Sequence, residues 1–289
     1  MDGAAKPVNT PLLLTLPSPA KLNLFLHITG RRADGYHNLQ TVFQLLNWGD
    51  TLCFETTRDD KITVLMGSLN IPDQQNLIVL AAQQLLKYRK HSNLGVTITV
   101  DKKIPTGGGL GGGSSNAATT LLALNRLWAL CLSPETLLEI GATLGADVPV
   151  FIAGNSAWAE GIGEQLTPLK LPPAWFLIVK PPVHVSTAEI FSHEQLTRDT
   201  SPITLAAFFE GSSRNDCQPI VESLHSDVTK VLNWLDIFGE AKLTGTGACA
   251  FVSFKTQAEA EAAKQQLPTK WTGYVAEGLN QSPVISALS

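Results

Sequence analysis

Apolar and polar residues alternate along several segments of this chain, as they do in half-buried β-strands. The segments with this pattern, or with an apolar run of strand length, are residues 16–65, Gly95–Asp101, Trp175–Lys180, Ala250–Phe254 and Val275–Gly278. Helices are predicted over Asn76–Arg89, Ala117–Leu130, the residues that follow Ser133, Thr187–Phe191, Asp227–Asp236 and Thr256–Gln266. Because strands and helices interleave in both halves without a regular βαβ repeat, the pattern predicts an α+β fold.

Particular residues indicate where some of these elements begin and end. Ser133 and Pro134 are typical of the N-cap and the first position of a helix. The residue before a proline disfavours the α conformation, so Asp147-Val148-Pro149 is expected to end that helical region. Two glycines within Ala157–Leu166 predict a hairpin or a connection. Residues 1–14 are expected to form an irregular tail.

The segment from residue 105 to residue 118 is Pro-Thr-Gly-Gly-Gly-Leu-Gly-Gly-Gly-Ser-Ser-Asn-Ala-Ala, and it lies between a predicted strand and a predicted helix. Glycine lets the backbone approach a ligand closely and adopt positive φ. The N-terminus of a helix adds unpaired N–H groups and partial positive charge. The order of strand, glycine loop and helix therefore predicts a phosphate-binding site.

Other glycine-rich motifs fit this segment less well. The P-loop pattern requires a lysine directly before Ser114, where the chain has glycine. A dinucleotide-binding pattern can be placed at Gly107, Gly109 and Gly112, but no acidic residue follows at about 20 positions. The triplets His-Arg-Asp and Asp-Phe-Gly of protein kinases do not occur in the sequence. A flexible linker is the alternative without a function.

The composition is that of a globular protein with a large core, since 44% of the 289 residues are hydrophobic and 16% are charged. This length suits two domains. The net charge of −4 argues against non-specific binding to nucleic acid, and no apolar run reaches membrane-spanning length. The four cysteines are widely spaced and form no CxxC motif, which favours reduced thiols in the cytoplasm over disulfides or a zinc site.

Four further segments carry reactive or charged side chains. Lys21 and Asn23 share one face of an apolar strand, although a lysine there also suits the solvent side of an edge strand. Residues 31–37, Arg-Arg-Ala-Asp-Gly-Tyr-His, form a binding turn or an ordinary surface turn. Asp147 places a carboxylate at a break after a helix, where aspartate is also a common turn former. Leu243–Phe251 contains a second glycine turn, or a tight hairpin.

Three of these motifs occur in an order that resembles the small-molecule kinase superfamily named after galactokinase, homoserine kinase, mevalonate kinase and phosphomevalonate kinase (GHMP). They are Pro-Ala-Lys-Leu-Asn-Leu from residue 19, the glycine segment from residue 105, and Leu-Thr-Gly-Thr-Gly-Ala from residue 243. Residues 30–41 and 145–149 resemble one family within it, the 4-diphosphocytidyl-2-C-methyl-D-erythritol kinases. The likeness extends from about Ser18 to Ser282.

The resemblance implies a two-domain GHMP kinase fold. Its N-terminal domain, ribosomal protein S5 domain 2-like, would cover residues 1–159 and bind ATP. A ferredoxin-like C-terminal domain on the substrate side would cover residues 160–289. The resemblance also implies a monomer or weak dimer that acts on a small molecule in the cytoplasm, without nucleic-acid or membrane partners.

The reaction implied by the resemblance is ATP-dependent phosphorylation of the 2-hydroxyl of 4-diphosphocytidyl-2-C-methyl-D-erythritol, which gives ADP and the 2-phosphate in the non-mevalonate route to isoprenoids. Asp147 would accept the proton of that hydroxyl, and Lys21 would orient it. Because the transition state of phosphoryl transfer is loose, it needs little assistance from a base. ATP with Mg²⁺ would be held by Pro105, Thr106, Gly107, Gly108, Gly109, Leu110, Gly111, Gly112, Gly113, Ser114, Ser115, Asn76, Leu77 and Lys102.

The cytidine of this substrate would give the turn at residues 31–37 a role. A cytosine ring has two π faces and a donor–acceptor edge, so Tyr36 and Phe191 would stack on the faces while His37 binds the edge. Asn23 would contact the substrate near its reacting end, and Thr187 is a further expected contact.

Three other functions use similar motifs. Homoserine and mevalonate kinases act on substrates without a nucleobase, so the sequence Asp-Gly-Tyr-His at residues 34–37 argues against them. A non-catalytic ligand sensor on the same scaffold need not keep both Lys21 and Asp147. A dinucleotide oxidoreductase would carry its glycine motif near the N-terminus and a carboxylate for the ribose.

Overall fold

The computed structural model describes residues 11–69, 71–90 and 93–288. Its strands are β1 Leu13–Arg31, β2 His37–Thr57, β3 Ile62–Leu65, β4 Gly95–Asp101, β5 Ala157–Glu160, β6 Gln165–Pro168, β7 Trp175–Lys180, β8 Lys242–Leu243, β9 Ala250–Phe254 and β10 Thr272–Leu279. Its α-helices are α1 Leu77–Leu85, α2 Gly112–Leu127, α3 Pro134–Leu144, α4 Val148–Ala153, α5 Thr187–Ser192, α6 Leu205–Phe209, α7 Gln218–Leu224, α8 Ser226–Leu235, α9 Gln257–Lys264 and α10 Pro283–Leu288. Among the described residues, no helix is both long and apolar enough to cross a membrane.

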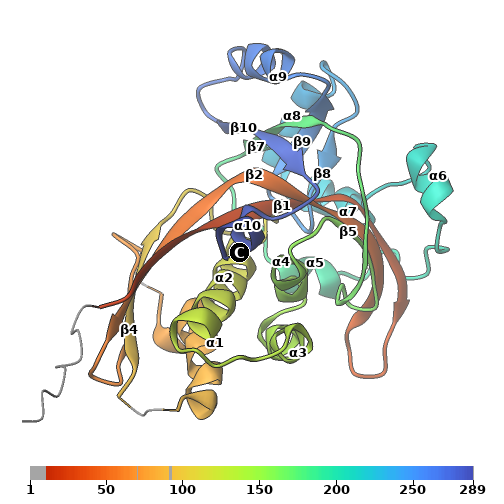
Figure 1. The fold of residues 1–289 in the computed structure, drawn as a ribbon. Helices are drawn as coiled ribbons and strands as arrows, with labels where there is room; N and C mark the ends of the chain where they lie inside the picture. The colour runs from red at the N-terminus through yellow and green to blue at the C-terminus, as the bar shows by residue number, and fades with distance from the viewer. Residues whose placement is uncertain (1–10, 70, 91–92, 289) are drawn as a thin grey trace, which may run out of the picture.

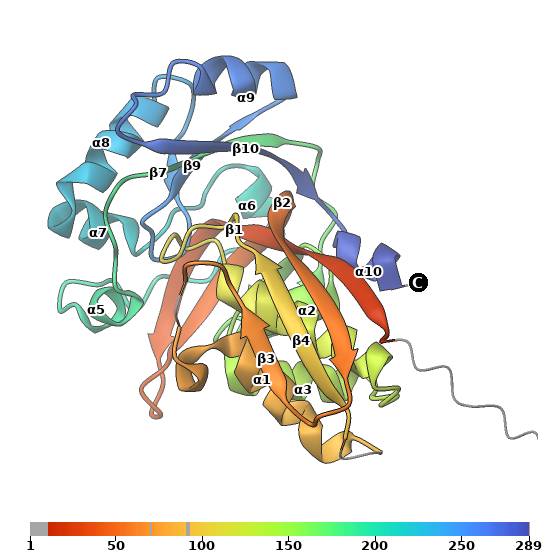
Figure 2. The same cartoon turned by 90° about the vertical axis from the view of Figure 1, so that its left-hand side faces the viewer.

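The strands form one continuous sheet in the order β3-β4-β2-β10-β7-β9-β8, with β1 and β5 also paired to β2, and β6 to β5. β1 and β2 form an arch; α1 to α4 lie beneath it, while β7, β9 and β10 lie above it with α8 and α9 (Figure 1). Figure 2 shows the same two halves from the side. β10 joins them, because its end pairs with β2 and the rest of it pairs with β7. This interleaving of strands and helices confirms the predicted α+β fold.

β1 and β2 are long antiparallel strands whose register shifts at three places, between Pro19 and Lys21, between Asn23 and Leu26, and between Ile28 and Gly30. A β-bulge bends its strand and re-aims the side chains beside it. Two of these shifts flank the segment that carries Lys21 and Asn23, and both residues are buried. The solvent-facing alternative for Lys21 is therefore excluded.

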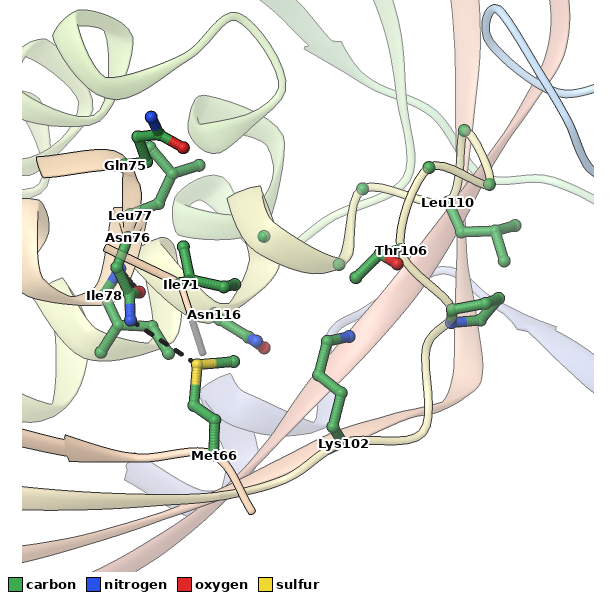
Figure 3. A pocket seen from close by; sticks show the side chains of 17 residues that line it. Met66, Ile71, Gln75, Asn76, Leu77, Ile78, Lys102, Thr106, Leu110 and Asn116 are labelled. Atoms are coloured by element: carbon green, nitrogen blue, oxygen red, sulfur yellow. Dashed lines mark hydrogen bonds between the residues drawn. The ribbon is translucent and has the colours of Figure 1, made fainter. Parts of the chain in front are cut away.

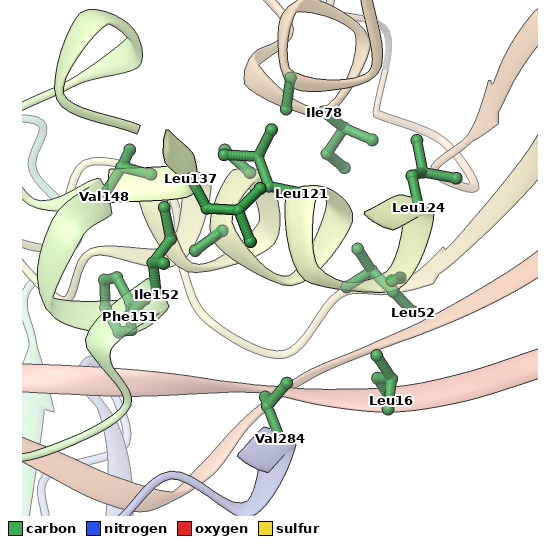
Figure 4. Close-up of a cluster of buried hydrophobic side chains, with 14 of the residues drawn as sticks. Leu16, Leu52, Ile78, Leu121, Leu124, Leu137, Val148, Phe151, Ile152 and Val284 are labelled. Carbon is green, nitrogen blue, oxygen red and sulfur yellow. The ribbon is translucent and has the colours of Figure 1, made fainter. Parts of the chain in front are cut away.

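The largest hydrophobic core lies between the helices beneath the arch and the sheet. Figure 4 shows Leu121 and Leu124 of α2 at its centre, with Leu52 of β2 and Val284 of α10 on the sheet side. Burying one such leucine contributes about 1.5–3 kcal/mol to stability. The helix nearest the C-terminus thus packs on the first half of the chain. The predicted boundary between residues 159 and 160 falls within the β5–β6 hairpin, and the division into two domains stays a prediction.

Three expectations about elements need correction. Residues 1–10 of the expected tail lie outside the described residues, and β1 already begins at Leu13, where it pairs with Glu55. The helix expected over Ala117–Leu130 begins earlier, at Gly112, so the last glycines of the loop belong to its first turn. Asp147-Val148-Pro149 begins α4 as well as separating it from α3, because proline is tolerated in the first turn of a helix.

The remaining predicted elements match the structure closely. The strands over Gly95–Asp101 and Ala250–Phe254 have the predicted bounds. Ser133 caps α3 by accepting a hydrogen bond from the backbone of Thr136, with Pro134 first in the helix. The hydrophobic pattern does not predict α6, α7 and α10, because helices of 5 to 7 residues are too short to show a period of about 3.6.

Candidate active site

Three adjoining cavities contain nearly all of the candidate site residues. The glycine-loop cavity, of about 250 Å³, is lined by residues 105–113 and by the start of α1. The Lys21–Asp147 cavity, of about 280 Å³, shares Gly109 and Gly111 with it. The Tyr36–His37 cavity, of about 440 Å³, shares with the Lys21–Asp147 cavity the residues Leu39, Ala146, Ile162, Thr187 and Phe191. Lys21 and Asp147 therefore lie between the other two cavities.

The glycine-loop cavity combines close backbone approach with a helix N-terminus. Gly107, Gly109 and Gly111 have φ of +65°, +73° and +72°, in the left-handed region that favours glycine. Gly111 is the N-cap of α2 and offers no side chain to the first turn, so backbone N–H groups there are open to a ligand. A helix N-terminus with open N–H groups attracts anions. The predicted order of strand, glycine loop and helix is confirmed, and phosphate binding by the loop stays a prediction.

Opposite the loop, the cavity has an apolar wall (Figure 3). Met66, Ile71, Leu77 and Ile78 line this side, which suits a flat aromatic group. Asn76 lines it too, but its side-chain oxygen also accepts a hydrogen bond from the backbone of Ile78 at 3.1 Å and so caps α1.

Lys102 closes the cavity on the sheet side. Its ammonium lies 2.8 Å from the carboxylate of Asp50, which is buried, so most of its charge is compensated within the protein. Its side chain therefore lines the cavity without presenting a free cation.

The two serines at the end of the loop point in different directions. Ser114 lines the Lys21–Asp147 cavity. Ser115 is fully buried, and its hydroxyl accepts a hydrogen bond from Ser18 of β1 at 2.8 Å. Consecutive residues of a helix point about 100° apart, and here Ser114 faces the cavity while Ser115 faces β1. The expected contact between the Ser115 hydroxyl and a phosphate is therefore not supported by the structure.

Lys21 and Asp147 form the charged centre of the site. The ammonium of Lys21 lies 3.2 Å from the carboxylate of Asp147, with side-chain exposures of 3% and 35%. It also donates to the side-chain oxygen of Asn23 at 2.6 Å and lies 5.3 Å from the centre of the Phe43 ring. Asn23 is held by Thr41, to which its amide donates at 3.0 Å. The ammonium is thus fixed in place, while the carboxylate remains accessible from the cavity.

The second glycine turn packs directly against the first glycine loop. Thr244 accepts a hydrogen bond from the backbone of Asn23 at 3.0 Å and donates one to the carbonyl of Gly109 at 3.3 Å. A Cβ at Gly109 would lie 2.2 Å from the carbonyl oxygen of Thr244. Gly245 and Thr246 line the Lys21–Asp147 cavity, and Thr246 shares a hydrogen bond of 2.9 Å with Thr187. Sequence reasoning did not indicate this packing, because no local pattern reports contact between two loops.

The Tyr36–His37 cavity is mainly apolar and aromatic. The ring of His37 stacks on the ring of Phe191, with centroids 5.3 Å apart and planes 26° apart. Tyr36 is 61% exposed at the rim. Burial lowers the pKa of His37, and the positive charges of Arg198 and Arg31 lower it further. The predicted stacking of Tyr36 and Phe191 on opposite faces of a base stays a prediction.

Comparison with known proteins identifies the family. Residues 76–155 match the GHMP kinases N terminal domain, and residues 195–273 match the GHMP kinases C terminal model. The 4-diphosphocytidyl-2-C-methyl-D-erythritol kinase of Hahella chejuensis is 51% identical over 95% of this chain and 96% of its own. That of Marinobacter nauticus is also 51% identical, over 96% of this chain and 98% of its own. The chain belongs to the 4-diphosphocytidyl-2-C-methyl-D-erythritol kinases.

Solved structures agree with this family and show the wider fold. A crystal structure of a 4-(cytidine 5'-diphospho)-2C-methyl-D-erythritol kinase matches with a TM-score of 0.79 and 30% identity, over 92% of this chain and 99% of that one. The mevalonate kinase of Methanococcus jannaschii matches with a TM-score of 0.64 at 17% identity, over 95% of this chain and 100% of that one. The second match shows the shared GHMP fold alone.

The site residues implied by membership of this kinase family are distributed in an ordered way. Those expected to hold ATP line the glycine-loop cavity, except Ser114 and Ser115. The expected catalytic pair and Asn23 line the Lys21–Asp147 cavity, together with Ser114. Tyr36 and His37 line the third cavity, while Thr187 and Phe191 face both it and the second. The functional roles of these residues stay predictions.

Proposed function

We propose that this protein transfers the γ-phosphoryl group of ATP to the 2-hydroxyl of 4-diphosphocytidyl-2-C-methyl-D-erythritol, forming ADP and the 2-phosphate in the non-mevalonate route to isoprenoid precursors. The main support for this proposal is the position of the charged pair between two cavities. A lysine–aspartate pair separated by 3.2 Å lies between a glycine-loop cavity suited to a nucleoside triphosphate and an aromatic cavity suited to a nucleobase. A substrate with a reacting alcohol at one end and a nucleobase at the other fits this order.

ATP would place its adenine against the apolar wall formed by Met66, Leu77 and Ile78, and its phosphates along the glycine loop. The backbone N–H groups at the start of α2 would then face the β- and γ-phosphates. Mg²⁺ prefers oxygen ligands, and the Ser114 hydroxyl lines the Lys21–Asp147 cavity next to the glycine loop. A magnesium ion bound there would offset the negative charge of the phosphates.

At the centre, the oxygen of the 2-hydroxyl would form a bond to the γ-phosphorus while the carboxylate of Asp147 accepts the proton of that hydroxyl. The bond from the γ-phosphorus to the bridging oxygen breaks, and ADP leaves. Lys21 would hold the hydroxyl in line and stabilise charge on the transferring group. Positioning and charge account for most of the catalysis in such reactions, which suits an ammonium fixed by Asn23 and Asp147.

The cytidine end of the substrate would occupy the Tyr36–His37 cavity, with the ring of Tyr36 stacking on the base. Phe191 would stack on the other face of the base. Thr187 lines both this cavity and the central one, so it would contact the part of the substrate that connects them. Mevalonate and homoserine kinases share the fold but need no such aromatic cavity. A cytoplasmic location and a monomeric or weakly dimeric state stay predictions.

The test offers the purified protein Mg²⁺, ATP and one alcohol at a time: the cytidyl substrate, mevalonate or homoserine. We expect ADP release with the cytidyl substrate alone, and one new phosphomonoester signal in the ³¹P spectrum. Turnover of mevalonate or homoserine without turnover of the cytidyl substrate would refute the proposal. His37→Ala should raise KM for the cytidyl substrate and leave KM for ATP little changed.

A further inference from the structure

Arg198 contacts the histidine that lines the candidate nucleobase cavity: its Nε donates a hydrogen bond to Nε2 of His37 at 3.1 Å. The rest of its guanidinium donates to backbone carbonyls, with Nη1 bound to Leu196 at 3.1 Å and Nη2 bound to Phe191 at 3.0 Å and His193 at 2.8 Å. Arg198 therefore ties the end of α5 to the turn that carries His37. No motif in the sequence distinguishes this arginine.

The direction of that hydrogen bond determines which ring nitrogen of His37 carries a proton. A guanidinium has five N–H donors and no acceptor, and it stays protonated. Nε2 of His37 must then act as an acceptor and carry no proton, so the neutral ring has its proton on Nδ1. The lowered pKa of His37, caused by burial and by the charges of Arg198 and Arg31, favours the same neutral form.

Nδ1 is left available to a ligand. Within the described part of the chain, Nδ1 forms no hydrogen bond, and it is not enclosed by protein atoms, so a ligand can reach it. His37 itself lines the Tyr36–His37 cavity. The ring therefore offers one hydrogen-bond donor, and no acceptor, to whatever occupies the cavity.

We propose that Arg198 is a positioning residue that selects the nucleobase by holding His37 as its Nδ1–H tautomer. This proposal rests on the function proposed above and adds the basis for the choice of base. The Watson–Crick edge of cytosine has an acceptor at N3, whereas uracil has an N–H donor at N3. A donor-only His37 facing N3 bonds to cytosine and opposes uracil with a second donor, which leaves both groups unpaired.

The first test observes the tautomer directly. The ¹⁵N signals of His37 in the ligand-free protein are assigned by their loss in His37→Ala. We expect a protonated Nδ1 and an unprotonated Nε2 in the wild type. In Arg198→Met we expect a shift toward the Nε2–H form, which neutral imidazole prefers in water, and a higher pKa of His37 because a nearby positive charge is removed. A wild-type ring protonated on Nε2 would overturn the proposal.

The second test measures selectivity as the ratio of kcat/KM for the cytidyl substrate to kcat/KM for its uridyl analogue. Arg198→Met removes the hydrogen bond from His37 to cytosine and also the donor–donor clash between His37 and uracil. Together these two losses lower the ratio by about tenfold or more. We expect Arg198→Met to lower the ratio by at least that factor, mainly through KM of the cytidyl substrate, and to leave KM for ATP within about twofold. An unchanged ratio would overturn the proposal.

Two controls separate positioning from a merely structural role. Ser186→Ala removes the cap of α5, where the serine hydroxyl accepts a hydrogen bond from the backbone N–H of Glu189 at 3.4 Å. It therefore loosens the same helix without changing a contact of His37. It should lower thermal stability but keep the selectivity ratio; a ratio that falls as far as in Arg198→Met would overturn the proposal. Arg198→Lys keeps the positive charge without the planar fork. We therefore expect the pKa of His37 to return part of the way to its lowered wild-type value, while the selectivity ratio stays as low as in Arg198→Met.

A further variant tests the coupling between the two side chains. In a His37→Ala background, Arg198→Met should cause no further loss of selectivity, because the donor it positions is already absent. A second, additive loss would contradict the proposal. If the wild type does not turn over the cytidyl substrate, the proposed function is refuted. If the wild type turns it over but its His37 ring is protonated on Nε2, only the inference about Arg198 is refuted.

Discussion

Replacing Lys21 by methionine should reduce catalysis strongly while leaving the fold nearly as stable as before. Methionine keeps much of the length and flexibility of the side chain, so it can still pack against the Phe43 ring, although the cation–π contact is lost. What is lost is the ammonium that lies 2.6 Å from Asn23 and 3.2 Å from Asp147. The opposing terms for this buried charge can be weighed from the structure.

At 3.2 Å and an effective dielectric constant of 20, the attraction between Lys21 and Asp147 is about 5 kcal/mol. Removing a charge from water costs several kcal/mol, and the Lys21 side chain is only 3% exposed. The two terms nearly cancel. Asp147, at 35% exposure, can be solvated again when its partner is removed. The Asn23 oxygen also loses its donor, but Asn23 lines the same cavity, where a water can replace the ammonium. We therefore expect a change of about 1 kcal/mol or less in the free energy of unfolding, which for a chain of this size shifts Tm by about 2–4 °C.

The loss in turnover should be much larger. One fixed group that stabilises transition-state charge contributes about 10²–10³ in kcat, so we expect that decrease for Lys21→Met with KM for the cytidyl substrate changed little. Differential scanning calorimetry and steady-state ADP release measure the two effects on the same preparation. A fall in Tm of more than about 10 °C, or turnover within tenfold of the wild type, would refute the assignment of Lys21 as a transition-state group.

The other predictions concern the base, the contact between the two glycine segments and a buried histidine. Asp147→Asn should retain ATP binding, measured by calorimetric titration, and lose about 10²-fold or more in turnover; turnover equal to the wild type would exclude Asp147 as the base. Gly109→Ala should destabilise the protein and raise KM for ATP, because φ is +73° and the added carbon would lie 2.2 Å from the Thr244 carbonyl. Gly113→Ala, whose added carbon meets Leu77 at 3.6 Å, is the stability control, and equal Tm losses in the two variants would contradict this reasoning. Burial lowers the pKa of His27 from its ordinary value of 6.5, with Asp216 opposing and Arg214 adding to the shift. Below pH 6.5 the unfolded chain then binds more protons than the folded one, so stability should fall as the pH drops from 6.5 toward the folded pKa. Between pH 7.5 and 5.5, Tm should therefore fall less in His27→Gln than in the wild type. An equal fall of Tm in both proteins would contradict this role of His27.

The hydrophobic pattern and local backbone preferences predicted most of the elements that build the site. The strand over Gly95–Asp101, the glycine loop and the helix behind it follow from periodicity and from the conformations that glycine allows. The order of three motifs predicted the superfamily, and residues 30–41 and 145–149 predicted the family within it. The predictions of elements succeed because each depends on neighbouring residues, and the family prediction succeeds because the motifs and their order can be read along the chain without its fold.

The sequence alone also predicted, by resemblance to a family, that Lys21, Asp147, Tyr36 and His37 belong to one site, and that assignment stays a prediction. Their arrangement was decided by tertiary structure. The bulges in β1 turn Lys21 and Asn23 inward, the packing of α2 on β1 turns Ser115 away from the cavity, and Thr244 closes against Gly109 across more than a hundred residues of chain. Arg198 reaches His37 in the same way, across a sequence separation of 161. Such contacts depend on the register of the β1–β2 pair and on the strands that join the two halves, and no segment of sequence carries that information by itself.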